Sequence, residues 1–228
     1  MEYNRKIINN RPSIDDNLVK KCREMVGVMS ASAVFSDAQK RDGVMDHEIK
    51  FRSVNKPFIG TALTVKLSPG DIVDCLPIFD IAQPGDVVVI DANGTANTSI
   101  WGGLMSGLAR AAGVAGAVID GSARDTDESK LLDFPIASRS VSPRAAHSAE
   151  SGRTTPIEIN VPVVCGGQIV NPGDLIVADE IGVTVVKYEN LEAVYEAAIE
   201  LASNEEKVRK EILSGATVAE LLEKFGRI

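Results

Sequence analysis

The chain has 228 residues, of which 44% are hydrophobic and 25% are charged, proportions that are ordinary for a globular protein with one sizeable core. The net charge of −8 argues against binding to a phosphate backbone, so we expect no nucleic-acid partner. No run of about 18 apolar residues predicts a membrane span, and neither a signal peptide nor an even set of cysteines predicts secretion, so we expect a cytoplasmic protein without a membrane partner.

The first part of the chain is predicted to form a helix and then a buried strand. Ser13 and Asp16 resemble a capping box, and apolar residues recur after them at helical spacing. The apolar run at 58–65 predicts a strand, and residues 72–81 predict a helix that is bent near a proline.

A short pattern, P-G-D-x-x-V-x-D-x-x-G, occurs twice, at residues 84–94 and 172–182. In each copy the Pro-Gly pair predicts a turn, and the apolar run after it predicts a buried strand. Two interpretations are open. The copies form a true structural repeat, or they are turn–strand units of a kind that recurs by chance in any β-rich protein.

Helices and strands are expected to alternate between and after these copies. A helix is predicted over 103–112, closed by Gly113, and a short one over 126–132. A polar, exposed loop is expected over 143–155. Strands are predicted at 114–120, 136–138, 161–165 and 183–187, the last two completing the sheet.

The C-terminal part is predicted to be helical. A long helix over 191–213 has apolar residues on one face, and Thr217 is placed to cap a last helix. No low-complexity linker divides the chain. We therefore expect a single domain over residues 1–228, in which residues 191–228 form a helical C-terminal extension.

The most informative residues lie between 93 and 125. Gly102 and Gly103 open the helix predicted from 103, and the N-terminus of a helix offers free backbone N–H groups to an anion. Arg124 and Asp125 follow the next predicted strand. An arginine can hold a carboxylate through two parallel hydrogen bonds, and an aspartate can hold a hard divalent cation. Together these residues predict a site for a small α-keto acid on a metal.

At these residues, and in the run G-V-A-G-A-V-I-D-G-x-x-R-D, the chain resembles the class II, metal-dependent 4-hydroxy-4-methyl-2-oxoglutarate (HMG) aldolases. That RraA-like family also contains the regulators of ribonuclease activity A. The resemblance covers roughly residues 15–215. It implies an α/β fold, a compact domain of swivelling β/β/α type with a mixed central sheet and a C-terminal helix. It also implies a homo-oligomer, a trimer or a hexamer, with active sites where subunits meet.

The resemblance implies roles for particular residues. Arg124 matches the family's substrate-binding arginine, and Asp125 matches its one direct protein ligand to Mg²⁺ or Mn²⁺, so both are expected to be catalytic. A glutamate of the neighbouring subunit helps to hold metal-bound waters in the family, and Glu205 and Glu206 are the candidates here. The backbone loop that receives the pyruvyl carboxylate matches Gly102, Gly103, Leu104 and Met105.

The chain departs from this family at Gly103, where the characterised aldolases often carry an acid that contacts a metal-bound water. Retro-aldol cleavage needs a base for the 4-hydroxyl proton, whereas decarboxylation of oxaloacetate does not. We therefore expect a divalent-metal-dependent lyase that acts on a small 2-oxo diacid through a pyruvate enolate, with decarboxylation exceeding HMG cleavage. The alternative is a non-enzymatic regulator that binds a ribonuclease complex. Asp125 favours the enzyme, because a pure binding protein needs no metal ligand.

Five further residues have alternative interpretations. Asp91 and Asp120 end predicted strands, where they cap turns or lie near the metal. Trp101 precedes the glycine pair, where it lines the pocket or packs in the core. Arg139 and Arg144 are candidates to contact a second carboxylate of the substrate.

Overall fold

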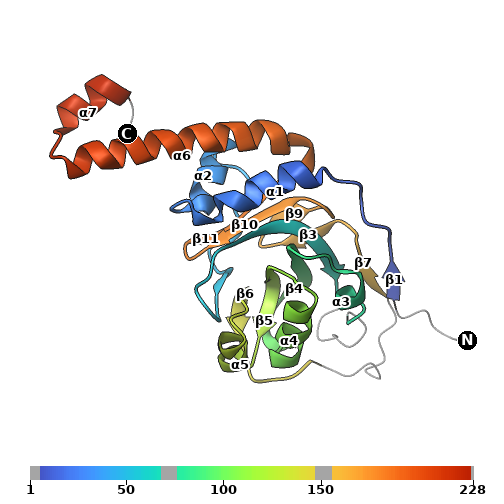
Figure 1. Ribbon diagram of the computed structural model, residues 1–228. Coiled ribbons are helices and arrows are strands. Elements are labelled where there is room, and N and C mark those ends of the chain that lie inside the picture. Colours follow the sequence, from blue (N-terminus) through green and yellow to red (C-terminus); the bar gives the residue numbers. More distant parts are fainter. Residues whose placement is uncertain (1–5, 68–75, 147–155, 227–228) are drawn as a thin grey trace, which may run out of the picture.

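A mixed sheet runs through the centre of the molecule (Figure 1). The computed structural model describes residues 6–67, 76–146 and 156–226. Strands β3 to β6 are parallel to one another, and β7 and β2 run antiparallel to their neighbours β3 and β6. The order across the sheet is β1 (Lys6–Ile8), β7 (Ile157–Ile159), β3 (Phe58–Lys66), β4 (Asp86–Trp101), β5 (Gly116–Ala123), β6 (Ile136–Val141) and β2 (Lys50–Phe51).

A second layer of strands covers one face of this sheet. Strand β10 (Leu175–Asp179) pairs with β3 and forms a hairpin with β11 (Gly182–Val186). A buried apolar cluster, which includes Val89, Val118 and Ile176, lies between the two layers. The central strands are therefore buried on both faces, which explains their nearly continuous apolar runs.

One predicted strand lies outside the central sheet, contrary to expectation. Residues Val163–Cys165 form β8, which pairs only with β9 (Gln168–Val170) in a separate two-stranded sheet of the described residues. The reason is the turn at Gly166 and Gly167, which both have positive φ angles and reverse the chain at once.

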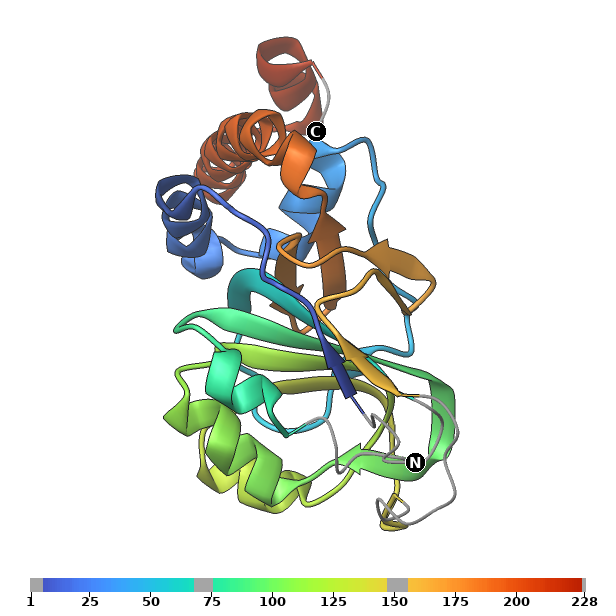
Figure 2. The ribbon, with the colours of Figure 1, turned by 90° about the vertical axis from the view of Figure 1, so that its right-hand side faces the viewer.

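Helices form the two outer layers (Figure 2). Helices α3 (Ile78–Ile81), α4 (Gly103–Ala111) and α5 (Thr126–Leu131) pack on one side of the sheet, around Trp101. Helices α1 (Asp16–Glu24), α2 (Ala31–Ala38) and α6 (Leu191–Leu213) pack on the other side, against β3, β10 and β11. Short 3₁₀ turns follow α1 at Met25–Gly27 and precede α6 at Tyr188–Asn190. This arrangement confirms the predicted α/β fold with a mixed central sheet.

Two helix starts differ from the sequence-based predictions. Asp15, not Ser13, caps α1, because its carboxylate accepts hydrogen bonds from the N–H groups of residues 17 and 18 at 2.9 and 3.3 Å. Helix α2 was not predicted at all. Its N-terminus is held by Asp179, which accepts hydrogen bonds from the backbone N and the Oγ of Ser32, both at 2.8 Å. This stabilising partner is distant in the sequence, so no local capping pattern marks the helix.

Strand β4 continues well past its expected end near Gly94 and reaches Trp101. Three register shifts interrupt its pairing with β5 beyond Asp91. The hydroxyl groups of Ser140 and Ser142 donate hydrogen bonds to backbone carbonyls of this irregular part, at 2.9 and 3.0 Å. The stretch N-G-T-A-N-T-S is polar enough to resemble a loop, but these contacts keep it in the sheet.

The two copies of the repeated pattern have the same local structure. Gly85 and Gly173 have φ angles of 86° and 87°. Asp86 and Asp174 each accept a hydrogen bond from the backbone N–H three residues earlier, at 2.8 Å. Strands β4 and β10, which follow the two turns, both pair with β3. This shared geometry favours the structural-repeat interpretation.

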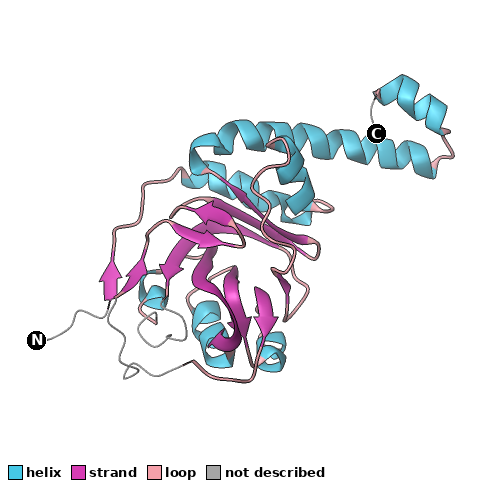
Figure 3. Cartoon of the chain, turned by 180° about the vertical axis from the view of Figure 1, so that it is seen from behind, coloured by secondary structure: helices cyan, strands magenta, loops and turns pink. Residues whose placement is uncertain are grey.

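The C-terminal helices extend beyond the body of the molecule (Figures 1 and 3). Helix α6 has the bounds predicted from its periodicity, and α7 (Val218–Phe225) turns back along it. The capping box of Thr217 with Glu220 confirms the predicted helix start. Residues 72–75 of the helix predicted over 72–81 and residues 147–155 of the predicted loop lie outside the described ranges. Among the helices that are described, none combines the length and apolar character that a membrane crossing requires.

Candidate active site

The ends of two neighbouring parallel strands bring the predicted site residues together. Trp101 at the end of β4 pairs with Ala123 at the end of β5. The backbone N–H of Arg124 donates to the carbonyl oxygen of Trp101 at 2.8 Å. Ligands of α/β proteins bind outside the carboxyl ends of such strands, because the following loops and helix N-termini converge there. Gly102 and Arg124 are thus neighbours although they are 22 residues apart.

The N-terminus of α4 carries no cap from its own N-cap residue. Gly102 is its N-cap residue and offers no side-chain hydrogen bond, so the first-turn N–H groups have no cap from that residue. Of the residues in this turn, Gly103 and Met105 are buried, whereas Leu104 is 81% exposed. The structure therefore places all four residues predicted for carboxylate binding at one helix N-terminus.

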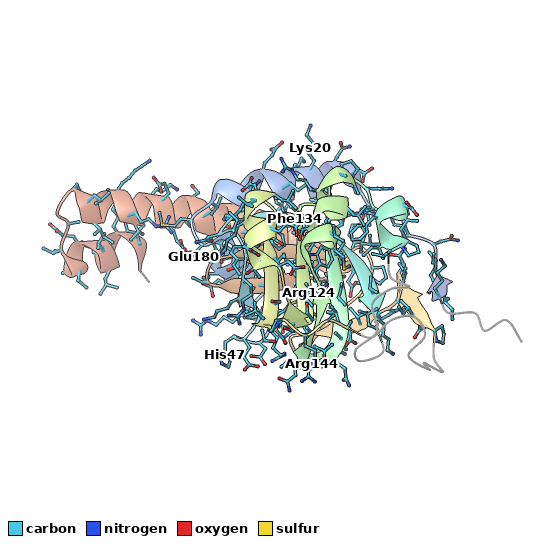
Figure 4. All side chains as sticks on the ribbon, turned by 90° about the horizontal axis from the view of Figure 1, so that it is seen from below. Lys20, His47, Arg124, Phe134, Arg144 and Glu180 are labelled. Carbon is cyan, nitrogen blue, oxygen red and sulfur yellow. The ribbon has the colours of Figure 1, made fainter. Side chains whose placement is uncertain are left out.

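The carboxylate of Asp125 points at this helix N-terminus. Its Oδ2 accepts a hydrogen bond from the N–H of Gly103 at 3.2 Å. Asp125 stands at the N-cap position of α5, but its backbone is left-handed (φ 51°, ψ 41°) and its side chain does not cap that helix. Arg124 Nε lies 3.4 Å from the same Oδ2, and the two side chains are 43% and 44% exposed. Both charged groups therefore remain accessible to a ligand, and Figure 4 shows where Arg124 lies below α4 and α5.

Because Gly102 and Gly103 have no side chains, two acidic side chains can approach the start of α4. A Cβ atom at Gly102 would lie 2.8 Å from Asp125 Oδ2. A Cβ atom at Gly103 would overlap the carboxyl group of Glu128, which comes from the first turn of α5. Sequence reasoning missed Glu128, because an acid in a first turn is common at any helix start. Only the close packing of α5 and α4 distinguishes Glu128 from other acids at helix starts.

A buried chain of hydrogen bonds joins α4 to α5 behind the site. Trp101 is 1% exposed and stacks on Phe134, with 6.0 Å between ring centroids. Its Nε1 donates to Ser106 Oγ at 2.9 Å, and Ser106 Oγ lies 2.8 Å from Ser129 Oγ. Ser129 Oγ in turn donates to the carbonyl oxygen of Asp125 at 3.1 Å. Of the two interpretations of Trp101, the structure favours core packing.

The surface beside Arg124 and Asp125 is hollowed by a cavity of about 290 Å³, which Val141 and Ser142 also line. A larger hollow of about 1010 Å³ lies elsewhere, between α2 and the C-terminal helices. The smaller cavity is the better candidate site. It contains the Arg–Asp pair, and its size suits a small organic acid.

Glu205 and Glu206 lie on α6 and are not part of this site within one chain. Glu205 Oε2 pairs with Arg209 Nη2 at 2.5 Å, and Glu206 Oε1 pairs with Lys210 Nζ at 3.4 Å. Helix α6 covers the opposite side of the molecule from α4 and α5 (Figures 1 and 4). The structure therefore does not bring these glutamates to Asp125 within a single chain.

Asp120 and Arg139 form a separate ionic cluster. Asp120 Oδ1 accepts a hydrogen bond from Arg139 Nε at 2.6 Å, and Arg139 also pairs with Asp46 and Glu48. The bond with Asp120 raises the pKa of Arg139. Asp91 accepts hydrogen bonds from backbone N–H groups at residues 93 and 164. The two aspartates thus have structural partners, which favours their interpretation as turn residues.

The remaining candidates do not add a metal-binding cluster. Arg144 lies at the exposed edge of the molecule, on the same side as His47 (Figure 4). Burial raises the pKa of Cys22 to about 12 and that of Cys165 well above its usual value, so neither thiol is a reactive nucleophile at neutral pH. In the described ranges, no three His, Cys, Asp or Glu side chains form a metal-binding group.

The donor set at Asp125 nevertheless fits one kind of metal. Mg²⁺ prefers oxygen ligands and takes only one or two carboxylates from a protein, while water and substrate supply the rest. The half-exposed carboxylate of Asp125 offers such a ligand, and Mn²⁺ accepts the same donors.

Comparisons with known proteins identify relatives. A family model described as RraA-like, Aldolase/RraA, matches residues 18–185. A protein of Halalkalibacterium halodurans, provisionally named 4-hydroxy-4-methyl-2-oxoglutarate aldolase, is 40% identical over 158 residues, which are 69% of this chain and 73% of that protein.

Solved structures with the same fold accompany these sequence matches. An uncharacterized protein from Pseudomonas syringae superimposes with a TM-score of 0.76 at 28% identity, covering 92% of this chain and 98% of that one. RraAS2 of Streptomyces coelicolor, described as an unusual member of the RNase ES inhibitor RraA family, has a TM-score of 0.72 at 27% identity, covering 88% and 98%.

Proposed function

This chain belongs to the RraA-like, Aldolase/RraA family, and from that membership we propose that it is a divalent-metal-dependent carbon–carbon lyase. Its substrate is a small 2-oxo diacid, which it converts through a pyruvate enolate as an HMG aldolase, an oxaloacetate decarboxylase, or both. The observation that carries the proposal is the carboxylate of Asp125, turned away from its own helix toward the N-terminus of α4 and beside Arg124.

Arg124 and the first turn of α4 would bind the carboxylate of the pyruvyl unit. The guanidinium matches a carboxylate in charge and geometry, and the helix N-terminus adds N–H donors and a partial positive charge. These groups would orient the substrate at the carboxyl ends of β4 and β5, where the bond between C3 and C4 is to be broken. In both reactions that bond breaks, and its electron pair moves toward the keto oxygen at C2.

Asp125 would hold Mg²⁺ or Mn²⁺ against the keto oxygen. When bound, the cation supplies Lewis acidity, which stabilises the charge that develops on this oxygen. Between residues 102 and 125 the chain contains no lysine, so this segment has no candidate for a Schiff base. This favours the metal-dependent class of aldolase over the lysine-dependent class.

We also propose a homo-oligomer, a trimer or a hexamer, in which Glu205 or Glu206 of a neighbouring subunit completes the site. Each chain then forms one domain over residues 1–228 with the helical extension at 191–228. The non-enzymatic alternative, a regulator that binds a ribonuclease complex, is supported by the similarity to RraAS2.

One assay separates these two functions. Pyruvate release is measured from HMG and from oxaloacetate, each with Mg²⁺, with Mn²⁺ and after exhaustive chelation. We expect turnover that requires the cation and is lost in Asp125→Ala. Calorimetry should detect Mn²⁺ binding to the wild type and not to Asp125→Ala. Glu192→Gln, a change at an exposed first-turn acid of α6, is the control. No turnover of either substrate would favour the regulator, and turnover after chelation would refute the metal requirement.

A further inference from the structure

We propose that Glu128 is a further catalytic residue of this site, the acceptor of the proton from the 4-hydroxyl group of a 4-hydroxy-2-oxo acid. The inference rests on the proposed lyase function and assigns a base for aldol cleavage to this chain. It is drawn from the position of the Glu128 carboxyl group over Gly103, the residue whose N–H donates a hydrogen bond to the carboxylate of Asp125.

Glu128 and Asp125 contact the same residue at the start of α4. Asp125 Oδ2 accepts the hydrogen bond from the N–H of Gly103 at 3.2 Å. The Glu128 carboxyl group fills the space where a side chain of residue 103 would begin. The proposed metal ligand and the second carboxylate therefore both lie at the helix N-terminus that would bind the substrate.

The backbone of Glu128 belongs to α5, and the residue after it links that helix to α4. Its carbonyl oxygen accepts a hydrogen bond from the N–H of Leu132 at 3.0 Å. The next residue, Ser129, is fully buried and lies 2.8 Å, Oγ to Oγ, from Ser106 of α4. Because α4 and α5 are joined in this way, the position of residue 128 over Gly103 is built into the fold.

The side chain of Glu128 is free to accept a proton. The residue is exposed, and within the described ranges its carboxylate has no ion pair and no hydrogen bond. Asp120, in contrast, is engaged by Arg139 and by the N–H of Gly166. Among the described residues, Glu128 is thus a carboxylate at this helix N-terminus without a structural partner.

The proton transfer balances the aldol cleavage. Glu128 takes the proton from the 4-hydroxyl, and the C4–O bond becomes a carbonyl as the C3–C4 bond breaks. The electron pair of that bond passes to the C2–C3 unit, which gives the enolate of pyruvate. Glu128 releases its proton to water, and C3 takes a proton from water, so no oxidant or other reactant is required.

Decarboxylation of oxaloacetate does not use this step, because carbon dioxide leaves without loss of a hydroxyl proton. Loss of Glu128 should therefore reduce aldol cleavage far more than decarboxylation. Considered alone, Gly103 predicted weak cleavage by the wild type. With Glu128 over that residue, we expect HMG cleavage that is readily measured.

A purely structural role for Glu128 makes a different prediction. Acids are favourable in the first turn of any helix, and replacing such an acid changes stability. Replacing a purely structural acid would not change the ratio of the kcat/KM values of two reactions catalysed by the same site. The ratio of kcat/KM for HMG to kcat/KM for oxaloacetate therefore distinguishes a proton acceptor from a helix-start acid.

The experiment compares the wild type with Glu128→Gln, Glu128→Ala and the control Glu192→Gln. We expect the first two variants to lower kcat/KM for HMG by about 10²–10⁴-fold, and that for oxaloacetate by less than about tenfold. The Mn²⁺ affinity, measured by calorimetry, should change by less than about threefold, because metal-ligand partners whose loss matters typically cost 10–100-fold.

A relocated carboxylate provides the sharpest test. In Gly103→Asp/Glu128→Ala the new side chain enters the space that the Glu128 carboxyl group has left. Residue 103 is the first residue of α4, where an aspartate is well tolerated. We expect this double variant to recover HMG cleavage by about tenfold or more over Glu128→Ala.

Two results would overturn this inference while leaving the proposed function intact. In the first, the wild type is active but Glu128→Gln leaves the ratio of kcat/KM for HMG to kcat/KM for oxaloacetate unchanged. In the second, the wild type decarboxylates oxaloacetate without cleaving HMG. An inactive wild type would overturn the proposed function and this inference with it. A Mn²⁺ affinity that falls in Glu128→Gln as far as in Asp125→Ala would make Glu128 a metal ligand and refute its role as the proton acceptor.

Discussion

The backbone conformation of Asp125 decides what its side chain contacts. A residue at the N-cap of a helix usually turns its carboxylate onto that helix. The left-handed conformation of Asp125 instead directs Oδ2 to Gly103 N of a different helix. Aspartate tolerates this conformation better than most residues, at a cost of about 1–2 kcal/mol. Strain of this kind is found at functional sites, where the surrounding structure compensates for it.

At Arg124 we expect geometry to matter more than charge. Arg124→Lys keeps the positive charge but loses the planar fork that can bind a carboxylate through two hydrogen bonds. Loss of one charge-assisted hydrogen bond costs about 1.5–3 kcal/mol, so kcat/KM should fall by about 10–100-fold. Steady-state kinetics with oxaloacetate is the measurement, and Arg110→Lys at the exposed end of α4 is the control. A loss of less than twofold would exclude bidentate binding.

Among the secondary-structure elements, β4 positions the site. Its irregular part returns the chain to the sheet at Trp101, next to the end of β5. Without this return, the N–H of Gly103 would not reach the carboxylate of Asp125. Register shifts increase local twist and redirect side chains, which is why they are common next to active sites. The polar, loop-like part of β4 therefore helps to determine the geometry of the site.

Helix α7 should lose the Glu220 half of its capping box in acid. Hydrogen bonds from the backbone N–H of Thr217, and from its hydroxyl group, lower the pKa of Glu220 below its ordinary value of 4.5. A lowered pKa stabilises the folded helix above the unfolded value, and this contribution is lost as the pH falls through the folded value. We expect the amide resonance of Thr217 to shift as the pH falls below the ordinary Glu220 pKa value of 4.5. In Glu220→Gln it should not titrate, and a shift there would contradict the assignment.

On the scale of the whole molecule, several large apolar side chains are unusually exposed. Leu104 and Leu131, on α4 and α5, are 81% and 87% exposed and lie on the two helices that form the site. Leu213 at the end of α6 is 87% exposed, and Val218 follows on α7. Large apolar side chains exposed in this way are typical of surfaces that other subunits cover. This supports the proposed homo-oligomer.

Subunit mixing tests whether the site is shared. Asp125→Ala and the double variant Glu205→Gln/Glu206→Gln should each be nearly inactive. When the two are dissociated, mixed in equal amounts and reassembled, some sites combine an intact Asp125 with intact glutamates of a neighbour. We expect recovery of about a quarter of the wild-type activity, as random assembly requires. Light scattering gives the oligomeric state, and a fully active monomer, or no recovery in mixed oligomers, would refute the shared site.

The sequence by itself determined most of the elements and much of the chemistry. The apolar periodicity of 191–213 and the buried run at 58–65 predicted α6 and β3, because such patterns depend on a few neighbouring residues. The family resemblance predicted that Gly102, Arg124 and Asp125 share one site, and the fold brings these three residues together.

Only the tertiary structure decided the contacts between distant elements. The cap of α2 by Asp179, the pairing of β8 with β9 and the path of β4 depend on partners far along the chain or on turn geometry. Glu128 belongs to the same group, because nothing in its own segment distinguishes it from an ordinary helix-start acid. Local propensity acts over a few residues, whereas the environment of a side chain is set by packing, and packing placed Glu128 over Gly103.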